Sequence, residues 1–524
     1  MGYNVLDFRR RRASGAFSPA RLFASGEEGA WYDPSDLSTL FQDSLGTTPV
    51  TTAGQPVGLM LDKSQGLTLG AQAITNGTFA TATDWTLTTG AAISGGQLEF
   101  SPGSTGEARQ SLTLDAGKTY IITFDIVRRA GAISVRLLGG TTNNFTTVGA
   151  TGSYAYHVVP NAGNNELIIV ATNTSVDADI DNISVREIPG NHATQATSAA
   201  RPTYQYEWDG VGPLGDELVT NGDGNSIIGW SSGNSANLSS VSGRLRVTNN
   251  GAGFGNASQS FTTVVGDTYK ITVSAFAGSS ASQRWRIGTS VGGSSIYDSG
   301  SEASDINYSF TFIATATETY VTFYANTSNT TAYAEYDNIS VKDIPVGSRL
   351  HFLAFDGVDD SMLTGTITPG VDKAQVFAGV RGLRSATSLI VEFSSNTNDN
   401  NGSFTTYRAG PAGWGHNSRG TSPDVLSVSS GFVAPTTNVL TGIGDISGPL
   451  TRISADGNVL ASSTGSQGTG NFLTYPLYIG ARAGTSLYFN GNMYGLITRF
   501  GPNLTDAQIA DTEAYVATKT GVTL

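Results

Sequence analysis

Short runs in which apolar and polar residues alternate make up most of the chain. Residues 269–275 read Tyr-Lys-Ile-Thr-Val-Ser-Ala, so every second side chain is apolar. This period places the apolar side chains on one face of a half-buried strand. Residues 120–126 follow the same period, but Ile121 and Val127 add apolar side chains to the second face. Pairs such as Gly95-Gly96 separate the runs at hairpin spacing. The pattern predicts an all-β chain.

Further strands are predicted in the last third of the chain, together with one helix. The apolar runs at 374–380, 389–393, 448–453 and 493–500 are typical of strands. Thr505 and Gln508 have the spacing of a capping box, Ile509 and Val516 share one helical face, and Gly521 suits the position after the last turn. We expect this single amphipathic helix to pack against the edge of a sandwich.

Composition agrees with short strands and many turns. Of 524 residues, 65 are glycine, 39% are hydrophobic and only 14% are charged. The length allows about three domains of ordinary size. There is no cysteine, which excludes disulfides, thiolate nucleophiles and zinc–thiolate sites. A net charge of −13 argues against nucleic acid as a partner. We find no apolar run of membrane-spanning length, so no membrane insertion is expected.

Two segments of the chain repeat each other. Residues 74–79 match 219–224, Trp85 matches Trp230, and the Asp-Asn-Ile-Ser-Val run at 181–185 recurs at 337–341. The separation between matching positions grows along the two copies. Such growth indicates loop insertions within a preserved order of strands, as in duplicated β-sandwiches.

Another set of motifs is spread over the whole chain and resembles a known sandwich. The run Leu61–Gly66 and the run Gly190–Thr203 look like two halves of one motif, and the further pieces are Gly29–Phe41, Phe355–Asp360, Tyr475–Arg482 and Leu504–Ile509. In this order they resemble laminin-G-like, concanavalin-type sandwiches of bacteriophage virion proteins, in which the first two runs are contiguous. The resemblance implies a discontinuous host sandwich (27–66, 191–213 and 347–524) that carries two inserted domains (67–190 and 214–346).

The inserts resemble jelly-roll carbohydrate-binding modules. Each has an opening Thr-Asn-Gly, a following Trp, a central Gly-x-Thr-Tyr strand and a closing Asp-Asn-Ile-Ser-Val strand. The resemblance implies glycan binding, and a structural calcium held by an acidic residue of the last strand and oxygen atoms near the first. The matching positions are Asp181 with Asn76 and Asp337 with Asn221. The alternative is that each Asp-Asn pair only opens the last strand and accepts hydrogen bonds from local amides.

The second insert is the better candidate for binding a glycan. Sugar recognition needs aromatic rings that stack on sugar faces and planar polar groups that reach hydroxyls. Trp285 is flanked by Arg284 and Arg286, and Tyr320 and Tyr324 follow. We expect these five residues to form the glycan-binding site. For any single ring, a place in the core is the alternative.

The repeat alignment favours the second insert for the same reason. In that alignment Val135 of the first insert replaces Trp285, Leu167 replaces Tyr320 and Ala171 replaces Tyr324. The first insert would therefore lack the rings of the predicted site.

No set of catalytic residues emerges from the sequence. The four histidines lack metal-binding spacing, no Gly-x-Ser-x-Gly elbow stands between a strand and a helix, and no phosphate-binding loop is present. Asp359 and Asp360 are adjacent, so on a strand they would point to opposite faces and could not form a glycosidase pair. The resemblance of the host sandwich implies that they lie in a turn, and we expect a protein that is not an enzyme.

Residues 1–26 are predicted to form an anchoring arm. They lack the periodicity of a domain but contain four arginines, Arg9–Arg12, and several apolar residues: Tyr3, Val5, Leu6, Phe8, Phe17, Leu22 and Phe23. Such residues suit burial against another chain. We expect the arm to bind other virion proteins and the chain to form a homo-oligomer, which is a trimer if the resemblance to phage fibres holds. The alternative is a disordered leader on a monomer.

The resemblance to phage virion proteins implies a tail or head fibre protein that is assembled in the bacterial cytoplasm and exposed on the released virion. Its jelly-roll modules would bind surface polysaccharide of the host cell. Two alternatives stay open at this point: a purely structural head or tail decoration protein, and a depolymerase of surface polysaccharide.

Overall fold

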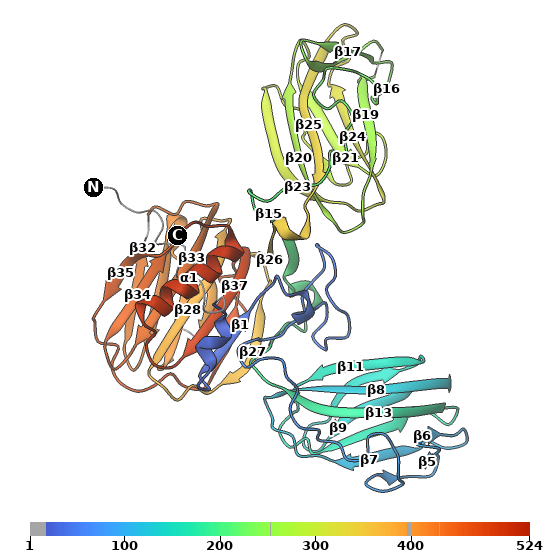
Figure 1. The fold of residues 1–524 in the computed structure, drawn as a ribbon, viewed down its shortest axis with the longest axis vertical. Helices are drawn as coiled ribbons and strands as arrows, with labels where there is room; N and C mark the ends of the chain where they lie inside the picture. Colours follow the sequence, from blue (N-terminus) through green and yellow to red (C-terminus); the bar gives the residue numbers. More distant parts are fainter. Residues whose placement is uncertain (1–16, 252, 396–399, 429) are drawn as a thin grey trace, which may run out of the picture. The chain divides into compact units, whose positions relative to one another are not determined.

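The computed structural model describes residues 17–251, 253–395, 400–428 and 430–524. Strands dominate, and α1 (Asp506–Thr520) is the one α-helix of these residues (Figure 1). The chain divides into two compact units, one made of residues up to 50, 56–203 and 352–524, the other of 51–55 and 204–351. The prediction of an all-β chain with one short C-terminal helix is confirmed.

The host sandwich is built from two large sheets. The first has the strand order β15 (Thr203–Trp208), β26 (Arg349–Asp356), β37 (Asn490–Phe500), β28 (Lys373–Gly382), β33 (Thr436–Asp445), β34 (Leu450–Ala455) and β35 (Asn458–Ser463), with β1 (Glu28–Tyr32) paired to β37. The second has the order β2 (Leu40–Phe41), β3 (Leu59–Met60), β14 (Ala193–Thr194), β27 (Met362–Ile367), β36 (Tyr475–Ile479), β29 (Ser388–Phe393), β30 (Ser403–Arg408), β31 (Trp414–Arg419) and β32 (Pro423–Val428).

Aromatic rings join the two sheets of the host. The ring of Phe500 on β37 lies 4.7 Å from that of Phe393 on β29 and 5.8 Å from that of Phe404 on β30, centroid to centroid. The four strands predicted in this part of the sequence are observed as β28, β29, β34 and β37. Five 3-10 helices occur among the described residues: η1 (Pro19–Phe23), η2 (Leu37–Thr39), η3 (Ser198–Ala200), η4 (Val346–Ser348) and η5 (Gly410–Ala412).

The predicted helix caps are present in α1. Thr505 accepts a hydrogen bond from the backbone of Gln508, whose side chain returns one to the backbone of Thr505, and Gly521 adopts a left-handed conformation with φ 69°. Ile509 and Val516 are buried against the first host sheet, in one cluster with Phe377, Ile497 and Trp31. The helix therefore covers the face of that sheet that is turned away from the second sheet.

The same cluster corrects the prediction of an arm. Leu22 and Phe23 at the end of η1 are buried in it, Phe17 packs beside them, and the Nε of Arg499 donates to the carbonyl of Leu22 at 2.7 Å. Residues 17–26 thus belong to the host sandwich, because their apolar side chains find a place on their own chain. The rest of the predicted arm, with Arg9–Arg12, lies outside the described residues.

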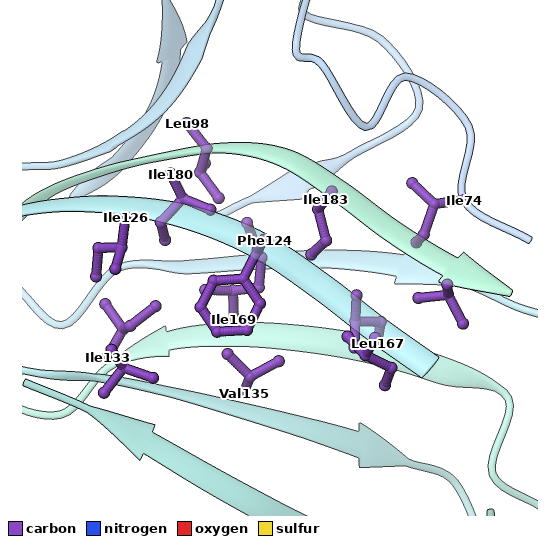
Figure 2. Packing of buried hydrophobic residues seen from close by; sticks show 14 of the residues in the cluster. Ile74, Leu98, Phe124, Ile126, Ile133, Val135, Leu167, Ile169, Ile180 and Ile183 are labelled. Carbon is purple, nitrogen blue, oxygen red and sulfur yellow. The ribbon is translucent and has the colours of Figure 1, made fainter. Parts of the chain in front are cut away.

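The first insert is a sandwich of two five-stranded sheets. The sheet that we call the β9 sheet has the order β10 (Asn143–Val148), β9 (Ile133–Leu138), β12 (Glu166–Ala171), β7 (Glu107–Ser111) and β4 (Thr86–Leu87). The other has the order β11 (Gly152–Val158), β8 (Thr119–Ala130), β13 (Asp177–Ile188), β6 (Gln97–Phe100) and β5 (Ala91–Ser94). Figure 2 shows the apolar side chains between them, among them Phe124, Val135 and Ile169.

The second insert repeats this arrangement. Its β21 sheet has the order β16 (Ser231–Gly233), β19 (Asn256–Thr262), β24 (Glu318–Ala325), β21 (Gln283–Gly288) and β22 (Tyr297–Asp298). Its other sheet has the order β17 (Asn237–Val241), β18 (Arg244–Thr248), β25 (Tyr333–Asp343), β20 (Thr268–Phe276) and β23 (Ile306–Ile313). Trp230, Trp285, Phe323 and Tyr336 fill the core.

The two inserts share individual hydrogen bonds as well as strand order. Gln110 accepts from the backbone N–H of Thr75 at 2.7 Å and donates to its carbonyl at 2.8 Å. Gln259 does the same with Thr220, at 2.6 and 3.0 Å. A buried glutamine therefore closes the first segment onto the sheet in both copies, which is strong support for duplication.

The matching tryptophans also have one structural role. The indole N–H of Trp85 donates to the carbonyl of Asn76 at 3.2 Å, and that of Trp230 to the carbonyl of Asn221 at 3.3 Å. Both rings belong to the cores of their inserts.

The ends of each insert lie side by side. The backbone N–H of Asn191 donates to the carboxylate of Asp62 at 2.7 Å. At the second insert, the hydroxyl of Ser348 donates to the carbonyl of Pro213 at 2.9 Å. An inserted domain needs such closeness, because the loop that it replaces is short. The observation supports a discontinuous host, and the boundaries 67–190 and 214–346 stay a prediction.

Candidate functional site

Strand β21 positions three of the five predicted glycan-binding residues. Successive side chains of a strand point to opposite faces. Arg284 and Arg286 therefore lie on the outer face of the β21 sheet, and Trp285 points into the core, where it is 0% exposed. Its ring packs on those of Phe323 and Tyr297, at centroid distances of 5.9 and 4.8 Å. The prediction that Trp285 contacts a glycan is wrong, because a fully buried ring cannot stack on a sugar.

The neighbouring strand β24 brings both tyrosines to the face of the arginines. In the register of the two strands, Arg284 lies opposite Tyr324 and Arg286 lies opposite Thr322. Tyr320 is two residues before Thr322 and is therefore on the same face. Four of the five predicted side chains are thus on one surface. Tyr320 is partly exposed, but Tyr324 is only 8% exposed.

The register of the strands also corrects the repeat alignment. Trp285 lies opposite Phe323 on β24, and the matching Val135 lies opposite Ile169 on β12. Counting from this pair, Tyr320 corresponds to Glu166 and Tyr324 to Val170, rather than to Leu167 and Ala171. The sequence alignment was displaced by one residue, which exchanges the faces of a strand.

An acidic residue holds the two arginines in place. The Nη2 of Arg284 lies 2.5 Å from the Oδ2 of Asp298, and the Nε of Arg286 lies 3.0 Å from the same oxygen. The hydrogen bond from Arg284 lowers the pKa of Asp298 to about 2. The three groups together keep one net positive charge, and their planar guanidinium groups are oriented before any ligand arrives.

A glycine-containing loop covers one end of this face. Gly292 accepts from the Nη1 of Arg286 and donates its N–H to the hydroxyl of Thr322, both at 2.9 Å. A Cβ at Gly292 would lie 2.8 Å from the hydroxyl of Tyr324. The loop thus lies against Tyr324 and explains its low exposure. The open part of the face is the part around Tyr320, whose hydroxyl donates to Glu318 at 2.9 Å.

The predicted calcium ligands Asp181 and Asp337 open a bulge of the last strand in each insert. Their Oδ1 atoms accept from the next residue's N–H, Asn182 and Asn338, both at 2.7 Å. Both asparagines have positive φ values, 53° and 50°. The carboxylates therefore stabilise a strained turn, which is the alternative role proposed from the sequence.

The predicted partners from the first segment lie near the same bulges. In the first insert the N–H of Ile183 donates to the carbonyl of Gly77, next to Asn76, at 2.9 Å. The amide of Asn76 donates to the carbonyls of Thr81 and Thr83, at 2.7 and 3.0 Å. Asn76 thus stabilises its own loop.

The second insert has a larger collection of oxygen atoms at this place. An open hollow of about 470 Å³ is lined by Glu217, Asn221, Asp223, Thr272 and Asn338, among others. Asp337 does not line it. Carboxylate and amide oxygens are the ligand types that calcium prefers.

The first insert has no such pair of acids, because Gln72 and Thr78 stand at the repeat positions of Glu217 and Asp223. The residue types therefore suit calcium better in the second insert than in the first.

Three aspartates of the host come close to one another. Asp356, Asp359 and Asp360 have carboxylate oxygens within 4.8 Å, the one such group among the described residues. Asp356 accepts from the N–H groups of Val358 and Asp359 at 2.7 and 3.3 Å, and Asp360 accepts from that of Asp356 at 2.9 Å. These bonds form a turn, as expected. Burial raises the pKa of Asp360 to about 6.

No helix in the part of the chain that the structure describes is long and apolar enough to cross a membrane.

No protein-family model matches the chain. No curated protein sequence matches it either. Solved structures with similar parts include the CBM40 domain of the Ruminococcus gnavus IT-sialidase bound to alpha2,3 sialyllactose, with 16% identity over 27% of this chain and 82% of that chain and a TM-score of 0.23.

Two further solved structures are similar to parts of the chain. The tandem CBM22 domains of Paenibacillus barcinonensis Xyn10C have 11% identity over 52% of this chain and 98% of theirs, with a TM-score of 0.20. A heptameric SAP-like pentraxin from Limulus polyphemus has 13% identity over 30% of this chain and 78% of its own, with a TM-score of 0.25.

Proposed function

We propose that this chain is a glycan-binding adhesion protein and that its second insert binds the glycan on the outer face of the β21 sheet. The observation that supports the proposal is the gathering of Arg284, Arg286, Tyr320 and Tyr324 on that one face. A ring offers a sugar an apolar surface, and guanidinium groups offer donors to its hydroxyls.

The four side chains would have different roles. Tyr320 is the accessible ring and would stack on a sugar. Arg284 and Arg286 would donate to hydroxyl oxygens, and Asp298, which orients both, would accept from a hydroxyl. Tyr324 lies under the loop at Gly292 and supports Arg286, whose guanidinium carbon is 5.4 Å from its ring centroid. Trp285 supports the face from within the core.

The resemblance of the host sandwich to phage virion proteins motivates the finer proposal of a fibre on a phage particle. A single shallow site of this kind binds weakly, so adhesion to a bacterial surface requires several copies acting together. A trimer of the chain on a tail or head fibre would supply them. The N-terminal sixteen residues would provide the attachment to other virion proteins.

A glycan array with the full chain tests the proposal. We expect binding to bacterial surface glycans, reduced at least about tenfold by Tyr320→Ala and by Arg284→Ala, the loss of one stacked ring or one charged donor. Tyr333→Ala is the matched control, because Tyr333 is a partly exposed ring on the other sheet. Its ring centroid lies 3.8 Å from the guanidinium carbon of Arg246.

Other outcomes point to the alternative functions. Unchanged array binding in both variants would contradict the proposed face. Binding to purified virion subunits without any glycan signal would favour a decoration protein. Release of reducing ends from the bound polysaccharide would favour a depolymerase.

A further inference from the structure

The first insert has a hollow on the face that corresponds to the proposed site of the second. Its volume is about 440 Å³, and it lies on the β9 sheet at the edge formed by β9 and β10. The lining residues are Ser134, Arg136, Asn144, Phe145, Thr146 and Thr147. The hollow is open and mainly polar, so it suits a hydroxylated ligand rather than an apolar one.

Arg136 occupies the same position as Arg286. Both arginines come directly after the matched core residues, Val135 and Trp285, and therefore both lie on the outer face. The Nε of Arg136 donates to the hydroxyl of Ser134 at 3.0 Å, and this hydroxyl donates to the carbonyl of Thr146 at 3.2 Å. Because Ser134 is only 4% exposed, it is a fixed support for the guanidinium group.

Arg136 differs from the comparable arginines in its charge environment. Arg109, on the same row of the β9 sheet, pairs with Glu107 at 2.7 Å and with Glu166 at 3.4 Å. Arg284 and Arg286 pair with Asp298. For Arg136, no ion pair with a carboxylate is found among the residues that the structure describes. Its positive charge is therefore not paired with a carboxylate of these residues.

A β-bulge shapes the rim of the hollow. The pairing of β10 with β9 shifts between Asn144 and Thr146, so that Phe145 turns into the core with 6% exposure. Asn144 and Thr147 on either side stay exposed beside Arg136 and Ser134. Bulges commonly redirect side chains in this way next to binding sites.

We propose that this hollow is a second binding site of the chain, specific for an acidic saccharide. The Nη groups of Arg136 would bind an oxyanion of the sugar in a bidentate manner, because a planar guanidinium matches a carboxylate or phosphate group. Asn144 and Thr147 would bind neighbouring hydroxyls. The site is separate from the face of Tyr320 and does not depend on it. The oxyanion is either a uronic acid carboxylate or a phosphate ester.

Native affinity electrophoresis of the full chain tests this site. The protein carries Tyr320→Ala, which removes the ring of the other proposed site, so that the two proposals fail or hold separately. The gels contain polygalacturonate, phosphomannan or dextran. We expect at least one of the two acidic polymers to slow the migration of the protein. Dextran should not slow it. The polymer that causes it identifies the oxyanion, and added salt should weaken the effect.

The added substitution Arg136→Gln should raise the apparent dissociation constant at least about tenfold, since a charged hydrogen-bond donor is lost. Arg109→Gln is the matched control on the same face. It removes the same charge and should leave the retardation by the acidic polymer unchanged. Melting temperatures of all variants verify folding. The proposal is overturned by equal retardation with and without Arg136, by equal retardation in dextran, or by no retardation in any polymer.

Discussion

The carboxylate of Asp62 accepts a hydrogen bond from the backbone N–H of Asn191 at 2.7 Å, although a whole jelly-roll domain separates the two residues in the sequence. The same carboxylate accepts from the N–H groups of Trp31 and Ser64, at 2.7 and 2.8 Å. The N–H of Asp62 donates to the Nδ1 of His192 at 2.9 Å. Asp62 is fully buried and joins three segments of the host.

Replacing Asp62 should destabilise the host sandwich strongly. Asp62→Ala leaves three backbone donors without an acceptor in a buried place, at a cost of about 1–3 kcal/mol each. We expect a loss of about 3 kcal/mol or more in calorimetry of the full chain. Asp36→Ala is the control, because Asp36 forms a more exposed ion pair with Lys63, and such pairs contribute about 0–1 kcal/mol. Equal effects of the two substitutions would contradict the role given to Asp62.

Substitution should lower the stability of the second insert much more at Trp285 than at Tyr320. Trp285→Ala leaves a large cavity in the core of the second insert and should cost about 3–5 kcal/mol of its unfolding free energy. Tyr320→Ala removes a partly exposed ring and should change stability by less than about 1 kcal/mol. Denaturant unfolding of the full chain measures both. A small effect of Trp285→Ala would mean that this ring is not part of the core.

Asp360 should make the stability of the host depend on pH. Its pKa is raised from 3.8 to about 6, mainly by burial and also by Asp356 and Asp359. A raised pKa favours the folded state at low pH, so this contribution is present below about pH 4 and is lost as pH rises through 6. The loss is at most about 3 kcal/mol.

Asp360→Asn should remove this dependence, since the amide oxygen can still accept from the N–H of Asp356. The difference in melting temperature between variant and parent, followed from pH 4 to 8, isolates Asp360 from other titrating groups. We expect the variant to become the more stable of the two above pH 6. A constant difference would show that Asp360 has an ordinary pKa.

Two N-terminal deletions should separate assembly from folding. Removal of residues 1–16 should convert a trimer into a monomer in light scattering and leave the melting temperature unchanged. Removal of residues 1–26 also deletes Leu22 and Phe23 from the cluster under α1, which should cost about 3 kcal/mol or more. A monomeric full chain would contradict the trimer, and an unchanged melting temperature after the longer deletion would contradict the packing.

Calcium should stabilise the second insert. An ion that binds only the folded state adds about 2.7 kcal/mol at a concentration one hundred times its dissociation constant. We expect a higher melting temperature with calcium than with a chelator, and a smaller increase after Asp223→Asn, because Asp223 lines the hollow. Asp181→Asn reports on the first insert in the same assay. If calcium changes no melting temperature, the aspartates act only in their turns.

Much of the local structure could be predicted from the sequence. The capping box of Thr505 and Gln508 and the glycine after the helix are short-range signals, and they are present as predicted. The duplication was also visible in the matching motifs of the two inserts, and in the structure Trp85 and Trp230 form the same hydrogen bond in each copy. Alternation placed strands correctly because it depends only on the period of the backbone.

The candidate site was predicted only in part, and alternation could have improved it. Arg284, Trp285 and Arg286 are consecutive, so their strand could not present all three on one face. The shifted alignment of Tyr320 and Tyr324 has the same origin, since one residue of register exchanges inside and outside. Arg136 was missed because its sequence gives no sign that it lacks the carboxylate partner that Arg109 has.

By itself, the sequence determined the strand-rich fold, the repeated insert, the helix caps and the existence of two alternating faces on each strand. The tertiary structure decided which face is covered, that Leu22 and Phe23 pack on their own chain, and that Asp62 meets Asn191. The physical reason is range. Backbone period, capping and turn preference act between residues a few positions apart, whereas burial and ion pairing depend on neighbours that the fold brings together from distant parts of the chain.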